Sequence, residues 1–442
     1  MKSLTFKQGI HPDYNKELTR DSSLQKASRP KTVMIPLQQH IGAPCNTLVK
    51  KGDHVKMGQK IGDTDSFVSA PVHASVSGIV EDIKEVQTPG GSSSQAVIIK
   101  ADEEDEVDNS MKTVEDLSDL TGAQIKDIVR EAGIVGMGGA MFPTHVKLSV
   151  PEDKDVEYFI LNGAECEPYL TVDHRMMIER PGDIVFGMKA LMKAADVKKG
   201  FIGIENNKPD AIVSMQEAVK DESNIEVKVF ETKYPQGGEK MLIKAALDRE
   251  VPVGGLPLDV GCIVNNITTA VAVNDALKKG MPLVERTVTI TGNGIQNPCN
   301  LIARIGTPIQ ELIEQAGGLK EDTGKIILGG PMTGFAQHNV LVPVIKGTSG
   351  ILVQLKKEVV KYDPKPCIKC ARCVDSCPQY LMPIQLSNFM EHNMIDELEE
   401  YNVLNCIECG CCSYVCPSNR PLLHNIKLAK AEVMARRREN NE

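Results

Sequence analysis

Residues 367–378 read CIKCARCVDSCP, and residues 406–417 read CIECGCCSYVCP. Each stretch has three cysteines separated by two residues, then a fourth cysteine after three more residues, followed by proline. Thiolates at this spacing hold [4Fe–4S] clusters, and the fourth cysteine of each run ligates the other cluster. The sequence therefore predicts a C-terminal module that carries two clusters and transfers electrons.

The crossover of the fourth cysteines defines the expected ligands of each cluster. The first cluster should be held by Cys367, Cys370, Cys373 and Cys416, and the second by Cys377, Cys406, Cys409 and Cys412. Cys411 is off this spacing, so we expect it to be a small packing residue. The alternative is zinc, whose structural sites usually pair two separated Cys-x-x-Cys knuckles, whereas the tripled spacing favours iron and sulfur.

The composition is that of an acidic globular protein. The chain has 442 residues, which suggests several domains, and a net charge of −9, which argues against a nucleic-acid partner. Cysteines clustered in this way indicate metal binding in a reducing compartment rather than disulfides.

No apolar run is long enough to cross a membrane, and the first 30 residues lack the apolar core of a signal peptide, so we expect a cytoplasmic location. Arg436–Arg438 is the one basic run that could meet a lipid surface, although such runs are more often solvated helix ends.

The patterning divides the chain into five expected segments. They are an N-terminal extension (1–29), a β-rich module (30–100), an α/β domain (113–280), a β–helix–β unit with a helix at 308–316 (285–355), and the helical cluster module (360–442). The α/β expectation comes from apolar strands that alternate with helical segments. The acidic run ADEEDEVDN at 101–109 should form a loop or linker.

The β-rich module resembles the lipoyl or biotinyl barrel-sandwich hybrid. The resemblance is carried by KKGDHV at 50–55, GQKIG at 58–62 and APVHASVSGIV at 70–80. In that family a lysine at a hairpin tip carries the prosthetic group. Here no lysine occurs between Lys60 and Lys84, so we expect a structural or docking module without a swinging arm.

A glycine-rich loop, GIVGMGGAMFPT at 133–144, follows an expected helix. Glycines let backbone N–H groups approach a phosphate or a planar ring closely, and Lys147 can add a positive charge. Such a loop alone is weak evidence, because glycines also form ordinary turns.

Four motifs in order resemble the NADH-binding flavoprotein subunit of respiratory complex I. They are the glycine loop ending in MFPT with Lys147, NGAECEP at 162–168, YPQGGE at 234–239, and VNN at 264–266. With the barrel-sandwich segment in front and the cluster module behind, nearly the whole chain resembles the C subunits of the Rnf complex, an ion-translocating ferredoxin:NAD oxidoreductase. The resemblance implies non-covalent FMN and a β-grasp domain of the SLBB type at 285–355.

The resemblance also implies site residues. FMN would be contacted by Gly136, Gly138, Gly139, Lys147, Asn162, Glu165, Tyr234, Gly237, Asn265 and Asn266. The nicotinamide nucleotide would be held by Phe142, through stacking, and by Glu167 and Glu239 as hydrogen-bond acceptors. No catalytic acid or base is expected, because the cofactors carry the chemistry.

Some positions depart from the complex I motifs, which implies different hydrogen bonding to the flavin and a different reduction potential. An arginine, an aspartate and a glutamate of that family are replaced by Met137, Ala164 and Gly238. Ordinary structural roles are the alternatives at other positions: core packing for Phe142, a turn for Asn162, and a helix N-terminal acid for Glu239.

The resemblance implies a peripheral electron-transfer subunit of the translocase class, on the cytoplasmic face of the membrane. Electrons would pass between NAD(H), FMN and the clusters, with a ferredoxin-like subunit and integral membrane subunits as partners. One alternative is a cobalamin reductase of the propanediol-utilisation type, in which the barrel-sandwich segment would lie at the C-terminus. Another is a non-enzymatic iron–sulfur carrier or scaffold, which NADH-dependent bleaching of flavin would distinguish from an enzyme.

Overall fold

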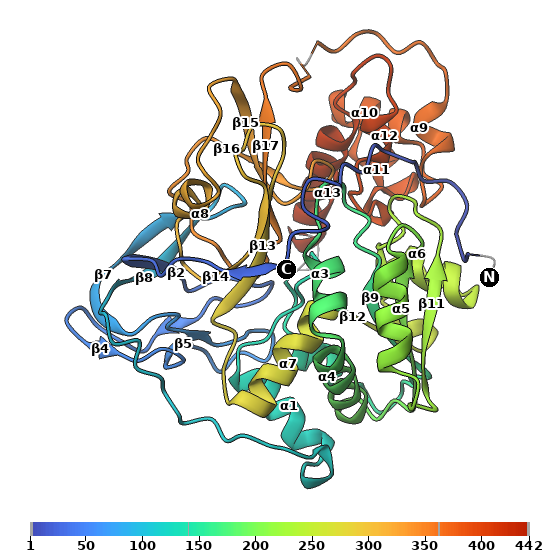
Figure 1. Cartoon of the computed structure of the whole chain (residues 1–442). Helices are drawn as coiled ribbons and strands as arrows, with labels where there is room; N and C mark the ends of the chain where they lie inside the picture. The colour runs from blue at the N-terminus through green and yellow to red at the C-terminus, as the bar shows by residue number, and fades with distance from the viewer. Residues whose placement is uncertain (1–2, 140, 361–362, 440–442) are drawn as a thin grey trace.

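The structure is a computed structural model that describes residues 3–139, 141–360 and 363–439 (Figure 1). Ala140, in the glycine loop, lies outside the described residues. In Figure 1 the blue β-rich module lies on one side, and the green α/β domain and the red helical module lie on the other. No helix within the described ranges combines the length and the apolar character needed to cross a membrane.

The N-terminal module consists of two small antiparallel sheets. Their strand orders are β2-β8-β7-β4 and β3-β5-β6. The strands are β2 (Thr32–Pro36), β3 (Asn46–Thr47), β4 (His54–Val55), β5 (Lys60–Asp63), β6 (Val72–His73), β7 (Gly78–Gln87) and β8 (Ser93–Ala101). Alternate side chains of both sheets, including Val33, Ile61 and Val97, form one shared core, as in other sandwiches.

Ala101 is the last residue of β8, and residues 102–109 form the expected acidic loop, which is fastened to the protein rather than free. Asp102 accepts a hydrogen bond from Ser77 (2.5 Å) and pairs with His54 (3.0 Å). Asp105 pairs with Arg304 (2.9 Å) of the β-grasp region. These partners offset the self-repulsion that the composition predicted.

The α/β domain is built on a parallel sheet with the order β11-β10-β9-β12. Its strands are β9 (Tyr158–Gly163), β10 (Lys199–Glu205), β11 (Ile225–Phe230) and β12 (Cys262–Asn266). Its helices are α1 (Gly122–Glu131), α2 (Thr144–Leu148), α3 (Val172–Glu179), α4 (Pro181–Ala194), α5 (Pro209–Ala218), α6 (Glu239–Leu247) and α7 (Ile267–Lys279), with 3-10 turns at Leu117–Asp119 and Pro257–Val260. Phe159 and Leu161 pack into the cluster that contains α1, α4 and α7, whereas Ile160 faces α6. Successive side chains of a strand point to opposite faces, so both faces are covered.

The order of the strands places a topological switch point between β9 and β12. The chain passes from β9 outward to β10 and β11, then returns to the other side of β9 as β12. In open parallel sheets, ligands bind beyond the carboxyl ends of the strands at such a point. Asn162 on β9 and Asn265 and Asn266 on β12 lie at these ends.

The β-grasp region forms a larger sheet than the expected β–helix–β unit. Its order is β1-β14-β13-β17-β15-β16. The elements are β13 (Glu285–Thr291), β14 (Cys299–Arg304), α8 (Ile309–Gln315), β15 (Thr323–Leu328), β16 (Phe335–Gln337) and β17 (Gly350–Leu355). The sixth strand, β1 (Leu24–Lys26), comes from the N-terminal extension and pairs in parallel with β14. The helix α8 lies where the sequence predicted a helix.

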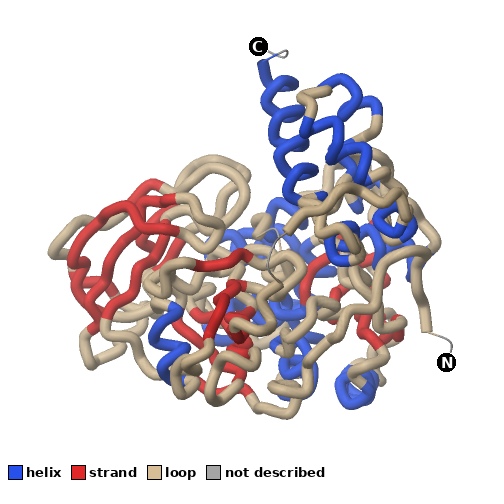
Figure 2. The backbone as a smooth tube through the Cα atoms, turned by 90° about the horizontal axis from the view of Figure 1, so that it is seen from above, coloured by secondary structure: helices blue, strands red, loops and turns tan. Residues whose placement is uncertain are grey.

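The C-terminal module is helical. Its elements are α9 (Arg372–Asp375), α10 (Pro383–Glu391), α11 (Ile395–Glu400), a 3-10 turn (Val403–Asn405), α12 (Cys411–Tyr414) and α13 (Leu422–Glu439). Figure 2 shows α13 projecting from the body of the molecule. Arg436 and Arg437 pair with Asp396 (2.5 Å) and Glu399 (2.7 Å) near α11. These ion pairs favour a solvated helix end over a lipid-binding run.

The residues before β1 form an N-terminal strap (residues 3–23), which runs over three of the domains (Figure 1). Leu4 pairs with Phe230 at the edge of β11, and Ile10 pairs with Tyr234. The Gly9 N–H donates to the carbonyl of Ser376 in the cluster module (3.2 Å). Asn300 of β14 donates to the carbonyl of Thr19 (2.9 Å), so the strap ties the α/β domain to both of its C-terminal neighbours.

Candidate functional site

Asparagines at the ends of β9 and β12 organise the switch point. Asn162 donates to the carbonyl of Gly237 (2.7 Å), which links the 162–168 and 234–239 loops. Asn266 caps α7, because its Oδ1 accepts from the Thr268 N–H (2.8 Å). Its Nδ2 donates to Asp173 (2.8 Å). Three of the motifs singled out in the sequence therefore meet at one end of the sheet.

The glycine loop lies over the first turn of α7. The Met137 N–H donates to Oγ1 of Thr269 (3.2 Å), and a Cβ placed on Gly138 would lie 3.1 Å from that of Asn266. Gly139 has φ +145° and open space where a side chain would be. The glycine loop therefore lies beside the N-terminus of α7, the positive end of its helix dipole, which suits an anionic group.

Two buried amide side chains at this site lack partners within the described part of the chain. Asn265 is 3% exposed, and neither its Oδ1 nor its Nδ2 has a hydrogen-bond partner. The same holds for Gln236, which is completely buried. An unpaired buried polar group costs about 1–3 kcal/mol, so both amides fit contact with a polar ligand such as FMN. Sequence reasoning predicted Asn265 but missed Gln236, although Gln236 lies inside the YPQGGE motif.

Lys147 and Glu239 lie close together near the end of β12, and Phe142 belongs to the glycine loop. Nζ of Lys147 donates to the carbonyl of Val264 (3.1 Å) and lies 3.7 Å from Oε2 of Glu239. Glu239 is the first residue of α6, where an acid also favours the helix. Phe142 is half-buried rather than part of the core, and its carbonyl accepts from the Gly136 N–H (2.8 Å).

Glu165 is buried behind the 162–168 loop, where Lys16 of the N-terminal strap reaches it. The Glu165 carboxylate accepts from the Asp173 N–H (2.7 Å) and lies 3.6 Å from Nζ of Lys16. Lys16 also donates to the carbonyls of Glu165, Glu167 and Leu170. Burial raises the pKa of Glu165, although Lys16 opposes this. Lys16 therefore holds the shape of a predicted flavin loop, and no local sequence signal marks it.

Glu167 already has partners in the β-grasp region. Its Oε1 accepts from the N–H groups of Met332 (2.7 Å) and Thr333 (3.2 Å), and a side chain at Gly330 would collide with it. Burial raises the pKa of Glu167. In this conformation the residue fastens the 162–168 loop to β-grasp residues 330–333. Its predicted contact with the nucleotide would require these hydrogen bonds to change.

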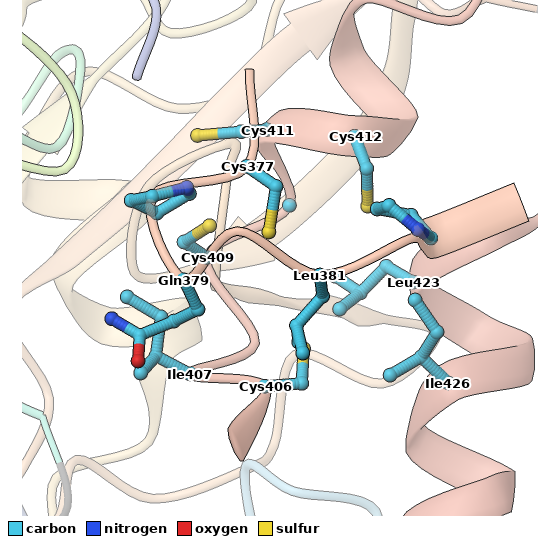
Figure 3. Close-up of a pocket in the computed structure, with 13 residues that line it drawn as sticks. Cys377, Gln379, Leu381, Cys406, Ile407, Cys409, Cys411, Cys412, Leu423 and Ile426 are labelled. Carbon is cyan, nitrogen blue, oxygen red and sulfur yellow. The ribbon is translucent and has the colours of Figure 1, made fainter. Parts of the chain in front are cut away.

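A pocket in the C-terminal module is lined by the cysteines predicted for the second cluster. Cys406, Cys409 and Cys412 surround it together with Cys377 from the first motif, so the chain folds as the ligand crossover requires (Figure 3). The sulfur of Cys411 turns aside and lies 3.9 Å from the carbonyl of Tyr234.

The cysteines predicted for the first cluster lie nearer the surface. Cys367 and Cys370 are exposed, whereas Cys373 and Cys416 are half-buried. Ile368, between the two exposed cysteines, is 67% exposed. This end of the module therefore faces outward.

Tyr234 connects the two candidate sites. Its side chain is 2% exposed, and its hydroxyl donates to the carbonyl of Cys409 (2.8 Å). Ile10 of the strap and Cys411 complete a small apolar cluster around it. The structure thus places this predicted flavin residue against the second-cluster pocket.

Nearby Cys166 accepts from the Gly237 N–H (3.2 Å), and burial raises the pKa of its thiol, in keeping with a packing role.

Comparison with protein families gives four matches in chain order. Residues 4–104 match the RnfC barrel sandwich hybrid domain, 129–275 the Nuo51 FMN-binding domain, 287–336 the SLBB domain, and 359–417 the 4Fe-4S dicluster domain. These matches confirm the predicted order of folds and the FMN and [4Fe–4S] cofactors; the limits given to each segment stay predictions. The barrel-sandwich match comes first, unlike the order expected for the cobalamin reductase alternative.

Curated relatives match along the whole chain. The chain is 47% identical to the C subunit of the Na(+)-translocating ferredoxin:NAD(+) oxidoreductase complex of Acetobacterium woodii, with 100% of both chains covered. It is 47% identical to the corresponding subunit of the proton-translocating complex of Clostridium ljungdahlii, covering 97% of this chain and 94% of the relative. It is 39% identical to the C subunit of the ion-translocating oxidoreductase complex of Rhodobacter capsulatus, covering 100% and 86%.

A solved structure shares the fold at low identity. A crystal structure of an NAD+-reducing [NiFe]-hydrogenase in the H2-reduced state matches with a TM-score of 0.50 and 16% identity, covering 75% of this chain and 69% of that chain. At this identity the likeness concerns the fold alone.

Proposed function

The chain belongs to the family of C subunits of ion-translocating ferredoxin:NAD(+) oxidoreductase complexes, and we propose on this basis that it carries electrons between NAD(H) and a partner subunit. It is a subunit of a multi-subunit, membrane-associated complex and an oxidoreductase of the translocase class. Its electron carriers are FMN and two [4Fe–4S] clusters.

The observation that carries this proposal is the path of the 234–239 loop. Its first residue, Tyr234, donates to the carbonyl of Cys409 in the second-cluster pocket. Three residues further on, Gly237 accepts from Asn162 at the switch point of the α/β sheet. One short segment therefore touches both the candidate flavin site and a candidate cluster, which is what direct electron exchange between them requires.

The residues of this chain would bind and orient the cofactors rather than act as acids or bases. The glycine loop, the end of β12 and Lys147 would hold FMN, while Phe142 and Glu239 would position the nicotinamide. When bound, FMN exchanges a hydride with NAD(H) and single electrons with the clusters. The apolar packing around Tyr234 keeps water from the region between the flavin loop and the cluster pocket.

The contacts also support an order for the two clusters. The cluster held by Cys377, Cys406, Cys409 and Cys412 would be next to the flavin, because its pocket contacts Tyr234. The other would be the outer cluster, because Cys367 and Cys370 are exposed.

We propose that the partner at this outer end is a ferredoxin-like subunit and that integral membrane subunits complete the complex. The chain would then lie on the cytoplasmic face of the membrane as a peripheral subunit. Co-purification from membranes with hydrophobic subunits would support this placement, and recovery only as a free protein would contradict it.

Anaerobic titration of the purified chain with NADH tests the function. We expect the flavin absorbance to bleach and the cluster absorbance to fall, without any other protein. If dithionite reduces the clusters but NADH reduces neither flavin nor clusters, the alternative of a non-enzymatic iron–sulfur carrier would stand instead.

A further inference from the structure

Arg286, on the first strand of the β-grasp sheet, is a buried cation without a full set of partners. It is 3% exposed, and its Nη2 donates to the carbonyl of Met137 in the glycine loop (3.1 Å). Its Nε and Nη1 have no hydrogen-bond partner among the described residues. Burial lowers the pKa of Arg286 to about 10, although Asp173 opposes this. An arginine remains charged even so.

Asp173, the acid whose charge acts on Arg286, makes no hydrogen bond to its Nε or Nη1. Both carboxylate oxygens of Asp173 already accept hydrogen bonds, one from Asn266 (2.8 Å) and one from Thr268 (2.9 Å). Burying an ion without a partner costs several kcal/mol, and unpaired donors add to that cost. The free Nε and Nη1 groups therefore point to an anionic ligand. A guanidinium donates two parallel hydrogen bonds, a geometry that matches phosphate.

The surroundings of Arg286 favour phosphate over other anionic groups. Its guanidinium meets the glycine loop at Met137, whose own N–H is held by Thr269 in the first turn of α7. The N-terminus of this 13-residue helix and the guanidinium are both positive, and Gly139 has open space where a side chain would be. The negative group at this terminus is the Asp173 carboxylate, which accepts from Asn266 and Thr268. A helix N-terminus or a glycine loop alone would not make an anion site. The buried guanidinium without partners at Nε and Nη1 is a second, independent indication of an anionic ligand.

The β-grasp region also binds the first residue of the glycine loop, because Nζ of Lys346 donates to the carbonyl of Gly133 (2.6 Å). Just before β13, the Leu283 N–H donates to the carbonyl of Ala132 at the end of α1 (2.9 Å). The start of β13 therefore runs directly beside the loop. This contact explains how a residue outside the α/β domain can reach a ligand bound there.

We propose that Arg286 binds the phosphate of the flavin mononucleotide, so that the β-grasp domain supplies a residue of the flavin site. This inference rests on the proposed function, because it takes FMN as the ligand of the α/β domain. It gives the β-grasp region a role beyond packing. It also means that the α/β domain without this region would hold an incomplete flavin site.

The test compares two flavins that differ only in the phosphate. Full-length protein with its clusters loaded and its flavin removed is titrated with FMN and with riboflavin, and the quenching of flavin fluorescence is followed. Arg286→Met should weaken FMN binding by about 10- to 100-fold and leave riboflavin binding unchanged. Arg286→Lys, which keeps the charge but loses the fork, should give an intermediate loss. Arg304→Met on the adjacent strand is the matched control and should bind both flavins normally.

Two other results overturn the inference. Unchanged FMN binding in Arg286→Met would mean that water satisfies the guanidinium. An equal loss for both flavins would place the contact on the ring or make it purely structural. If Arg286→Met fails to load clusters, Arg286→Lys decides in its place, by whether it loses FMN affinity without losing riboflavin affinity. Wild-type protein that binds neither flavin would contradict the proposed function instead.

Discussion

Removing one crossover cysteine at a time should separate the two clusters and reveal their order. Cys377 is buried in the pocket that contacts Tyr234, whereas Cys416 belongs to the exposed end of the module. Cys377→Ala should destroy the cluster next to the flavin, and Cys416→Ala should destroy the outer one. Each variant should lose about half of the roughly eight iron atoms that two cubane clusters contain. Alanine is preferred to serine because a serine oxygen can replace a thiolate ligand.

The two variants should then differ in how electrons reach the surviving cluster. In Cys416→Ala, NADH should still reduce the remaining cluster, because this cluster lies beside the flavin loop. In Cys377→Ala, dithionite should reduce the remaining cluster but NADH should do so far more slowly, because the intermediate carrier is missing. Low-temperature EPR after anaerobic addition of either reductant measures both outcomes.

A matched control removes a cysteine that is outside the ligand spacing. Cys411→Ala should keep about eight iron atoms and normal reduction by NADH, because the sulfur of Cys411 faces the carbonyl of Tyr234 instead of the pocket. The reasoning is refuted if Cys377→Ala and Cys416→Ala behave alike toward NADH, or if Cys377→Ala loses the cluster of its own sequence motif.

Three further predictions concern the flavin site and its support. Burial lowers the pKa of Lys346 from 10.5 to about 8, so the buried charge destabilises the folded protein below pH 8. The free energy of unfolding should therefore rise by up to roughly 3 kcal/mol between pH 8 and 10.5. Denaturant titrations of Lys346→Met should lack this rise. Lys147→Ala should lose FMN during gel filtration while keeping its clusters, and retention equal to wild type would remove Lys147 from the site. Phe142→Ala and Glu239→Gln should keep clusters that dithionite reduces, but NADH should reduce them more slowly. The rate should fall roughly a hundredfold if the nicotinamide shifts by about 1 Å. Normal rates in stopped-flow assays would place the nucleotide elsewhere.

The features that could be predicted from the sequence are those that depend on residues close together in the chain. The cysteine runs have a spacing that specifies the chemistry, and alternating strands and helices specify a parallel sheet. The end of β9 could be foreseen because NGAECEP follows an apolar run, and parallel strands place their carboxyl ends together. The comparisons confirm the family, the order of folds and the cofactors.

The features that could not be predicted depend on contacts between distant segments. Lys16 binds carbonyls about 150 positions away, and Arg286 reaches back to Met137 from another domain. Nothing near either residue in the sequence marks it as buried, since an isolated lysine or arginine is usually exposed. Gln236 differs, because it lies inside a quoted motif, and only its complete burial without partners distinguishes it from its neighbours.

Three contacts join the cluster module to the α/β domain, the N-terminal strap and the β-grasp region. Tyr234 holds the backbone of Cys409, Gly9 of the strap holds Ser376, and Lys427 lies over the ring of Phe335 (5.4 Å). Two of the cysteines predicted for the first cluster, Cys367 and Cys370, are exposed. With the flavin in the α/β domain, as proposed, this packing would place the second cluster beside it and leave the first cluster available to a partner. An electron relay needs this asymmetry, since a module docked through its exposed cysteines would have a buried entrance and no exit.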